Sequence, residues 1–418
     1  METRIHIGKN LDEGGKAWLH PSCWMSHLHL TGLTRSGKSS LLLLLCIALI
    51  EMRKAFLLLD PHGDLYRDVI AEFARRDYKR EVILFDPSND KRIVGANFFL
   101  THYTDEGQIM TNAERKSKQL TQSFGLQNTD MFGNIERYLR ALFYTILDRR
   151  LSICDLVYFL HWEFKREREK IIDKVSSIEI KAELNDLYSS KVEFERKIGP
   201  TKNKLQRFIH PQMKRIMGLT ENNVDFKGLV DKGRPMLCNL QPSENDLVGS
   251  ENTRALATLI LSEFWENFKK STKCKEFYVI ADEAQNVFTP SLTQILPESA
   301  KRGLHLILSH QDLGQLSPEL NSAFKNAQTK FIFSSEENPK MQRHFTLRRA
   351  SGEQIECEAS MLQKSYINPK TVEAFIERNT KHFMTPEQVD ARLNRSHNEE
   401  VPKEDNPIQE LTYERFLK

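Results

Sequence analysis

Residues 32–39 read GLTRSGKS, a full match to the phosphate-loop pattern G-x-x-x-x-G-K-[S/T]. The apolar residues 28–30 before this loop predict a strand, and residues 39–52 after it predict a long, buried helix. Glycines let successive backbone N–H groups turn toward phosphate oxygens, and the helix N-terminus adds partial positive charge at the same place. This context disfavours a chance match in a turn and predicts a triphosphate-binding loop.

The residue types in this loop suit the chemistry of a nucleotide. Lys38 is expected to bridge the β- and γ-phosphates, and the Ser39 hydroxyl is expected to join the shell of a Mg²⁺ ion. The expected ligands are therefore ATP and Mg²⁺. The predicted nucleotide contacts are Gly32, Thr34, Arg35, Ser36, Gly37, Lys38, Ser39 and Ser40.

The rest of the chain alternates between two kinds of sequence. Short apolar runs bounded by turn residues predict buried strands at 28–30, 56–59, 82–85, 236–240, 277–281, 304–309 and 330–334. Helical patterns lie between several of them, at 39–52, 65–75 and 255–269. Strands separated by helices predict an α/β fold built from parallel βαβ units. Residues 105–230 instead carry apolar residues at helical spacing with few turn signals, which predicts an inserted helical domain.

A second part of the site is expected about 245 residues after the phosphate loop. Residues 277–283 read FYVIADE, an apolar strand that ends in two acids, which is the Walker-B arrangement. Ligands of open α/β sheets bind at the carboxyl ends of the strands, so both acids should face the nucleotide. Asp282 is expected to hold Mg²⁺, and Glu283 to act on the attacking water as general base. A helix N-terminus with two acids is the alternative when this motif is taken alone.

Two further strand ends carry polar side chains. The strand at 304–309 leads to Gln311, which is expected to sense the γ-phosphate, and to His310, which is more often a structural residue in such a position. After the strand at 56–59, Asp60 and Asp64 are second-rank candidates, because turn chemistry alone explains them.

Composition limits the class of protein. Lys and Arg number 60 and Asp and Glu number 57, so any nucleic-acid contact must be a local patch. Six cysteines without a C-x-x-C pair are typical of a reduced, intracellular protein, and no apolar stretch reaches the ~20 residues of a membrane span. We expect a cytoplasmic protein. Residues 396–418 predict a loosely ordered tail, with a partner-binding segment as the alternative.

The ordered set of motifs resembles the HerA–FtsK branch of RecA-like motor ATPases, and within it the TraG/TraD-type coupling ATPases of conjugation and type IV secretion. The resemblance rests on TGLTRSGKSS (31–40), LLLDPHGDL (57–65), VILFDPSN (82–89), GNIERYLRALFYTIL (133–147), NKLQRFIHPQMKRIMG (203–218), FKGLVDKGRPMLCNL (226–240), DEAQ (282–285) and GLHLILSHQDLGQL (303–316). It covers most of residues 25–335.

This resemblance implies a RecA-like, mainly parallel sheet with helices on both faces and an inserted all-α domain. The implied domains are a nucleotide-binding domain at 1–104 and 231–395, a helical insert at 105–230 and a tail at 396–418. It also implies a homo-oligomeric ring, commonly six subunits, that threads DNA largely independently of sequence with ATP bound between subunits.

The chain also departs from the family. No N-terminal membrane helices are present, and about 25 residues precede the first expected strand, too few for a β-barrel domain. Relatives carry an arginine finger where this chain has Ala300; Lys301 and Arg302 follow, and Arg302 is the candidate to reach a neighbour's γ-phosphate.

Two basic clusters are candidate contacts for nucleic acid. The first, expected on one exposed helix face, is Lys202, Lys204, Arg207, Lys214 and Arg215, and a solvated face explains it equally well. The second is Arg343, Arg348 and Arg349, and the aromatic residues beside the clusters, Phe208 and Phe345, are expected in the core.

Two functions are therefore compared. The first is an ATP-driven DNA translocase of the coupling type. The second is a nucleotide-binding regulatory subunit that assembles with a partner nuclease; a secretion component is another possible partner. Ala300 favours the second slightly, because without an arginine finger hydrolysis would be slow.

Overall fold

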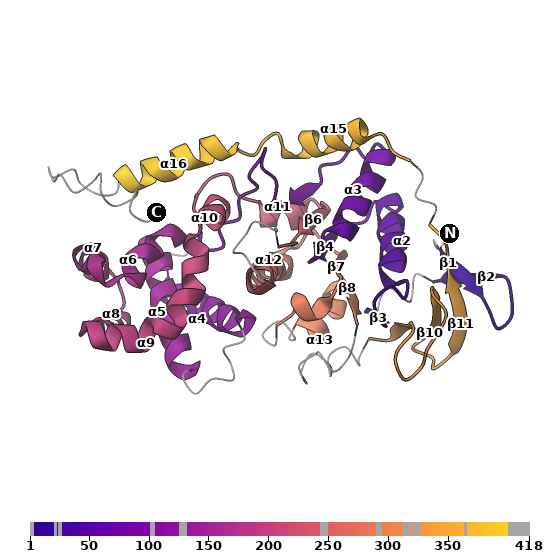
Figure 1. Cartoon of the computed structure of the whole chain (residues 1–418), viewed down its shortest axis with the longest axis horizontal. Helices are drawn as coiled ribbons and strands as arrows, with labels where there is room; N and C mark the ends of the chain where they lie inside the picture. Colours follow the sequence, from indigo (N-terminus) through magenta and orange to yellow (C-terminus); the bar gives the residue numbers. More distant parts are fainter. Residues whose placement is uncertain are drawn as a thin grey trace.

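The computed structural model describes residues 4–20, 23, 27–100, 105–124, 132–242, 250–289, 295–311, 318, 321, 327–362 and 366–399. Its central feature is a run of parallel strands: β3 (Leu28–Thr31), β4 (Phe56–Asp60), β5 (Ile83–Phe85), β6 (Met236–Asn239), β7 (Phe277–Ala281), β8 (Leu304–His310) and β9 (Thr329–Ile332). They lie in the order β9-β3-β8-β7-β4-β6-β5, of which Figure 1 labels the part from β3 to β6. The predicted parallel sheet is confirmed.

Both faces of this sheet are buried. Successive residues of a strand point to opposite faces, and on β4 the side chains of Phe56 and Leu58 join one apolar core while those of Leu57 and Leu59 join the other. Helices α2 (Lys38–Glu51) and α3 (Asp64–Arg75) cover the first face. Helix α12 (Ser250–Lys270) and the short α13 (Ile295–Ser299) lie on the second.

The segment expected as a helical insert is helical. It contains α4 (Glu106–Ser123), α5 (Phe132–Arg149), α6 (Leu156–Leu160), α7 (Lys165–Ile172), α8 (Ile178–Leu187), α9 (Lys191–Leu205), α10 (Pro211–Met217) and α11 (Phe226–Asp231), which we call the helical region (Figure 1). The apolar core of this region is continuous with the core on the α12 face of the sheet, so the two share one interior. Where one domain ends and the next begins stays a prediction.

Four strands extend the sheet beyond β9. They are β1 (Ile5–Asn10), β2 (Lys16–Leu19), β10 (His344–Arg348) and β11 (Gln354–Ala359), in the order β2-β1-β11-β10-β9. All of their pairings are antiparallel, and we call these four strands the antiparallel arm. The expectation that the strand at 28–30 is the first in the chain is therefore wrong, because β1 and β2 precede it and pair with a strand near the other end of the chain.

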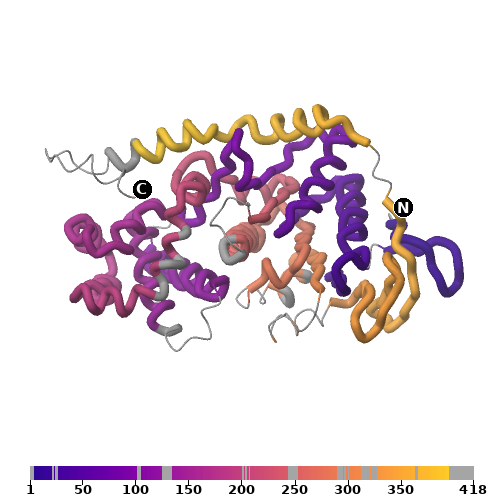
Figure 2. Tube along the Cα trace, in the orientation of Figure 1, coloured from indigo at the N-terminus to yellow at the C-terminus, as the bar shows by residue number. Residues whose placement is uncertain are grey.

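Two C-terminal helices, α15 (Pro369–Thr380) and α16 (Pro386–Glu399), run from the sheet to the helical region. We call them the C-terminal strap; Figure 2 shows it as the yellow tube along one side of the molecule. Helix α15 packs on α3, and α16 packs on α10. Helix α16 extends to Glu399, so the first four positions of the segment expected as a tail are helical. Residues 400–418 lie outside the described residues.

Buried hydrogen bonds fasten the strap to the sheet. The amide oxygen of Asn379 accepts the backbone N–H of Val82 at 2.9 Å, and its amide nitrogen donates to the carbonyl of Phe375 at 2.8 Å. Because the Asn379 side chain is buried, its removal leaves two polar backbone groups without these partners.

The Asn379→Ala substitution is expected to lower the free energy of unfolding by about 1–3 kcal/mol, the cost of leaving a buried backbone donor unsatisfied. Urea unfolding monitored by circular dichroism measures this loss. The control is Glu373→Ala on the exposed side of the same helix, where the solvent-screened ion pair with Lys91 contributes little to stability. Equal losses in the two variants would contradict the assignment.

The first basic cluster does not lie on one helix. Helix α9 ends at Leu205, a 3-10 turn spans Gln206–Ile209, and α10 begins at Pro211, whose ring cannot donate a helical hydrogen bond. Arg215 is engaged in a bidentate pair with Asp390 of α16, at 2.8 and 2.6 Å. The side chains of Lys204 and Arg207 lie outside the described part of the chain. A nucleic-acid rim at this place stays a prediction.

The second basic cluster lies on the antiparallel arm. Arg343 pairs with Glu358 and Arg349 with Glu353, whereas Arg348 is exposed on β10. Phe208 and Phe345 are fully buried, as expected. Within the described ranges, every helix is too short or too polar to cross a lipid bilayer.

Candidate nucleotide-binding site

Parallel pairing brings the predicted site residues to one edge of the sheet. The phosphate loop follows β3, Asp282 and Glu283 follow β7, and Gln311 follows β8, which lies between the other two strands. The carboxyl ends of parallel strands share an edge, so residues 243 positions apart in sequence meet: the Ser39 hydroxyl lies 3.4 Å from Asp282 Oδ2.

The phosphate loop needs its glycines. Gly32 and Gly37 have φ angles of 150° and 115°, which side chains rarely adopt. A Cβ atom on Gly32 would lie 2.5 Å from Cβ of Phe333, and one on Gly37 would lie 3.1 Å from Cα of Arg343. The loop is thus packed tightly against the segment that follows β9. Ser36 is buried, whereas the side chains of Thr34, Arg35, Ser39 and Ser40 are exposed.

Lys38 is the buried cation of the site. Its ammonium group donates to the carbonyl oxygens of Gly32 at 2.6 Å and Leu33 at 3.0 Å, which places it inside the curve of the loop. Burial lowers the pKa of Lys38, and the nearby carboxylates of Glu283 and Asp282 oppose that effect. The amine therefore lies in the field of both predicted acids.

Asp282 has oxygen donors on both sides. Its Oδ1 accepts the Ser309 hydroxyl at 2.8 Å, and its Oδ2 faces Ser39. Burial raises the pKa of Asp282, and the charges of Asp60 and Glu283 add to the rise, while Ser309 and Lys38 oppose it. A divalent cation beside this carboxylate would offset the cost of ionising it.

Glu283 is held through both of its carboxylate oxygens. Gln311 donates to Oε1 at 2.8 Å, and Gln285 donates to Oε2. The carbonyl oxygen of the Gln311 side chain accepts the Thr34 hydroxyl at 3.1 Å, so the phosphate loop is linked to Glu283 through one amide. Glu283 also has left-handed backbone angles, φ 48° and ψ 59°, which are uncommon for a residue other than glycine.

The second-rank acids have structural roles. The buried Asp60 accepts the backbone N–H groups of His62 at 2.9 Å and Tyr66 at 2.8 Å, so it caps the first turn of α3. Asp64 forms an exposed ion pair with Arg67. Asp60 still influences the site, because β4 lies beside β7 and its charge acts on Asp282.

His310 pairs with a second buried histidine on the neighbouring strand. Nε2 of His29 on β3 lies 3.3 Å from Nε2 of His310, and the ring centroids are 4.5 Å apart. Burial, with smaller contributions from the charges of His310 and Lys330, lowers the pKa of His29 to about 3. The two buried rings contact each other next to Gln311, which supports the structural interpretation of His310.

This pair makes stability depend on pH. In the unfolded chain a histidine has a pKa near 6.5, so between about pH 3 and pH 6.5 the unfolded state binds a proton that folded His29 does not. Stability therefore rises with pH through this window and is constant above it. From about pH 7.5 to pH 5, the loss is expected to be about 2 kcal/mol.

The measurement is urea unfolding at both pH values for the wild type and for His29→Gln. The substitution is expected to reduce the pH-dependent loss by about 2 kcal/mol, because the variant has no titrating group at this position. His62→Gln, at an exposed histidine, is the control and should leave the loss unchanged. The same pH dependence in all three proteins would contradict the role of His29.

Arg302 lies at the amino ends of the parallel strands, whereas the phosphate loop lies at their carboxyl ends. It ends a 3-10 turn just before β8, whereas Gln311 lies just after this strand. At ~3.3 Å per residue, the strand separates the two by about 25–30 Å. Arg302 is exposed and cannot reach the phosphate loop of its own chain, so only a neighbouring subunit could receive it. The side chain of Ala300 lies outside the described part of the chain.

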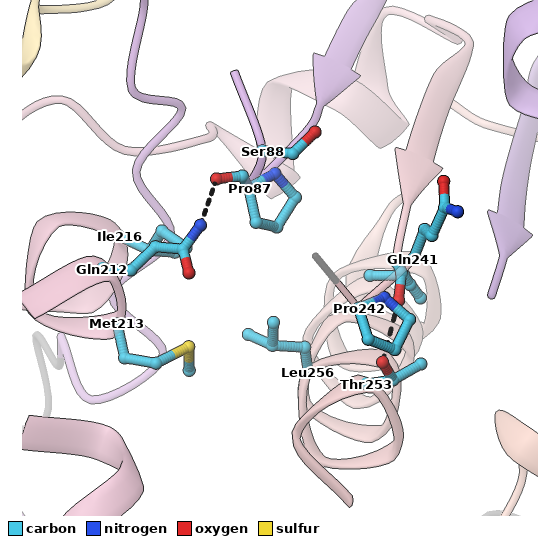
Figure 3. Close-up of a pocket in the computed structure, with 10 residues that line it drawn as sticks. Pro87, Ser88, Gln212, Met213, Ile216, Gln241, Pro242, Thr253 and Leu256 are labelled. Carbon is cyan, nitrogen blue, oxygen red and sulfur yellow. Dashed lines mark hydrogen bonds between the residues drawn. The ribbon is translucent and has the colours of Figure 1, made fainter. Parts of the chain in front are cut away.

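A small cavity lies farther along the same edge of the sheet, near the ends of β5 and β6 (Figure 3). Its volume of about 20 Å³ suits one water molecule. Gln212 donates to the carbonyl of Pro87 at 2.8 Å, and Thr253 donates to that of Leu240 at 2.8 Å, so polar groups at its wall are bonded to one another. The cavity is too small for a nucleotide.

Two contacts at the site were not predicted. Ser309, whose hydroxyl donates to Asp282, lies on β8 two positions before Gln311, which follows the strand. Alternate residues along a strand share a face, so the spacing of Ser309 and Gln311 was a usable signal. Gln285 lies two positions after Glu283, in a 3-10 turn that no pattern in the sequence indicated.

No protein-family model and no curated protein matches this sequence. Solved structures do match. The plasmid coupling protein TrwB in complex with the ATP analogue ADPNP superposes with a TM-score of 0.63 at 14% identity, over 88% of this chain and 97% of that one. TrwB in complex with ADP and Mg²⁺ gives 0.55 at 15% identity, over 86% and 88%.

A second solved protein shares the architecture. VirB4 of Thermoanaerobacter pseudethanolicus superposes with a TM-score of 0.56 at 14% identity, over 86% of this chain and 96% of that one. The predicted RecA-like fold, and the resemblance to coupling-type ATPases at the level of fold, are confirmed.

Proposed function

We propose that this protein is a P-loop ATPase of the coupling type, which binds ATP and Mg²⁺, assembles as a ring and moves DNA. The observation that carries the proposal is the meeting of Lys38, Ser39, Asp282 and Glu283 at one edge of the sheet. The Ser39 hydroxyl lies 3.4 Å from the Asp282 carboxylate, although 243 residues separate them.

The donor set suits a magnesium nucleotide. The phosphate loop offers backbone N–H groups, a helix N-terminus and a lysine, which together favour phosphate oxygens. Ser39 and Asp282 offer a hydroxyl and a carboxylate, the oxygen ligands that Mg²⁺ accepts while it keeps several waters. When bound, the ion would neutralise charge on the β- and γ-phosphates.

The residues of this chain would then divide the work of hydrolysis. Lys38 exchanges its two carbonyl partners for phosphate oxygens and holds the triphosphate in place. Glu283 orients a water and takes its proton as the water oxygen bonds to the γ-phosphorus and the bond to the β–γ bridging oxygen breaks. Gln311, which bonds both Thr34 and Glu283, ties the position of the base to the phosphate loop.

The place of Arg302 supports the proposed ring. An arginine that stabilises the γ-phosphate can act from a neighbouring subunit, and this one lies exposed at the far edge of its own sheet. We propose that Arg302 fills this role in the place of the arginine absent at position 300. We propose that basic side chains of the assembled subunits contact the phosphates of DNA, so that binding does not depend on the base sequence.

The test is the rate of phosphate release from ATP with and without duplex DNA. A motor is expected to show several-fold stimulation by DNA, and native mass measurements with an ATP analogue and DNA should show a multi-subunit particle. Intact nucleotide binding without turnover would overturn the motor and favour the regulatory subunit instead.

A further inference from the structure

The antiparallel arm supports the phosphate loop directly. The backbone N–H of Leu33 donates to the carbonyl of Ser334 at 2.8 Å, and the N–H of Arg343 donates to the carbonyl of Ser36 at 2.9 Å. The segment between β9 and β10, residues 333–343, is therefore bonded to the phosphate loop at both of its ends. We call it the β9–β10 loop.

The positions of the site residues set the direction of a bound nucleotide. Ser39 and Asp282, which would hold Mg²⁺ at the β- and γ-phosphates, lie toward β8 and β7, so the γ-phosphate is expected on that side. The nucleoside end of the molecule must leave on the other side of the phosphate loop. On that side β9 is the next strand, and its carboxyl end continues into the β9–β10 loop.

Three exposed apolar residues lie close in sequence to the backbone bonds that join these segments. Among the described residues, nine large apolar side chains are exposed, and three of them are Leu33, Met341 and Met361, with exposed fractions of 39%, 73% and 75%. Each lies within two residues of a backbone hydrogen bond that the β9–β10 loop makes with the phosphate loop or with the end of β11. For Met361 that bond is from the N–H of Ala359 to the carbonyl of Arg343, at 2.9 Å.

Four polar side chains of the β9–β10 loop are bonded within the protein. The hydroxyls of Ser334 and Ser335 each accept a backbone N–H at 3.0 Å, from Lys340 and Asn338. The charged groups of Lys340 and Arg343 pair with Glu356 and Glu358 of β11 at 2.7 Å. These pairs engage the two cationic groups that flank Met341, whose exposed thioether is available to a ligand, and sulfur contacts favour aromatic rings.

We propose that Leu33, Met341 and Met361 form the platform on which the base of the nucleotide lies. The inference rests on the proposed nucleotide site and adds the class of base that it takes. These side chains would contact the flat face of the aromatic base and not its polar edge. Such contact favours the larger purine bases over pyrimidines and distinguishes only weakly between adenine and guanine.

The test compares ligands with and without a base, by calorimetric titration of the full chain with ATP, GTP, CTP and inorganic tripolyphosphate. The double variant Met341→Ala/Met361→Ala is expected to raise Kd for ATP and GTP by about threefold to thirtyfold and to leave tripolyphosphate within about twofold. The wild type should bind ATP and GTP within about threefold of each other and CTP more weakly.

The matched control is Ile178→Ala/Val192→Ala, two side chains of similar exposure, 78% and 75%, in the helical region. It should change none of the four affinities. A second variant, Met341→Trp, adds a fluorophore at an exposed position; ATP is expected to quench its emission, and tripolyphosphate is not.

Three outcomes would overturn the platform. One is unchanged ATP affinity in the double variant, and another is an equal loss for ATP and tripolyphosphate, which would mean that the loop only supports the phosphate site. A third is an effect on self-association alone, which would assign the patch to a second copy of the chain. If the wild type binds neither ATP nor tripolyphosphate, the proposed function itself fails, and the two failures are thus distinguishable.

Discussion

The Glu283→Gln variant is expected to hydrolyse ATP about 10²–10⁴-fold more slowly than the wild type, the usual contribution of a positioned general base. An amide cannot take the proton of the attacking water, whereas its size and hydrogen-bonding reach match those of the carboxylate. Gln285 and Gln311 both donate to this side chain, so one of these amides must turn over to bond the new amide. ATP affinity should change by less than about threefold.

Steady-state phosphate release at saturating ATP measures the rate, and calorimetric titration measures the affinity. Glu298→Gln, at an exposed glutamate of α13, is the matched control and should turn over at the wild-type rate. Full activity in Glu283→Gln would remove Glu283 from the chemistry, even if nucleotide binding were intact.

The Lys38→Ala variant is expected to bind ATP at least about a hundredfold more weakly. Each hydrogen bond between the lysine and a charged phosphate contributes about 1.5–3 kcal/mol, and Lys38 is placed to make two. The ammonium group is buried and lies in the field of Asp282 and Glu283, so its removal also leaves the carboxylates unbalanced beside an anionic ligand.

Titration with ATP and with tripolyphosphate should show the same loss for both, since Lys38 contacts phosphates alone. Lys232→Ala, at an exposed lysine after α11, should leave both affinities unchanged. Urea unfolding without nucleotide confirms that the variant is folded. Wild-type affinity in Lys38→Ala would rule out the loop at residues 32–39 as the phosphate site.

The parallel sheet was predictable because burial on both faces leaves a direct mark in the sequence. A strand such as β7 is apolar at every position, so a short uninterrupted run identifies it. The same reasoning placed Asp282 and Glu283 at the edge where the phosphate loop ends, because parallel strands have their carboxyl ends in common.

The antiparallel arm and the C-terminal strap were not predictable in this way. Strand β2 alternates between exposed and buried side chains, and β11 carries two glutamates, so no apolar run reveals either strand. Their partners are also far away in sequence: β1 pairs with β11, more than 340 residues later. Register over that distance is decided by packing and not by a local pattern.

At the site, the sequence indicated which side chains meet but not how they are held. That Gln311 bonds both Thr34 and Glu283, and that Gln285 takes the second carboxylate oxygen, depends on side-chain orientation at the ends of strands. The left-handed backbone conformation of Glu283 could not be predicted either, because it is set by the turn that follows β7.

The C-terminal strap has a mechanical consequence. It is bonded to β5 through Asn379 and to α10 through the bidentate pair of Asp390 with Arg215, while a single apolar interior joins the sheet and the helical region. A hinge between these parts would have to break the ion pair and open that interior. In the proposed ring, each subunit would therefore move as one rigid body, and the size of its movement would be set at the contacts between neighbouring subunits.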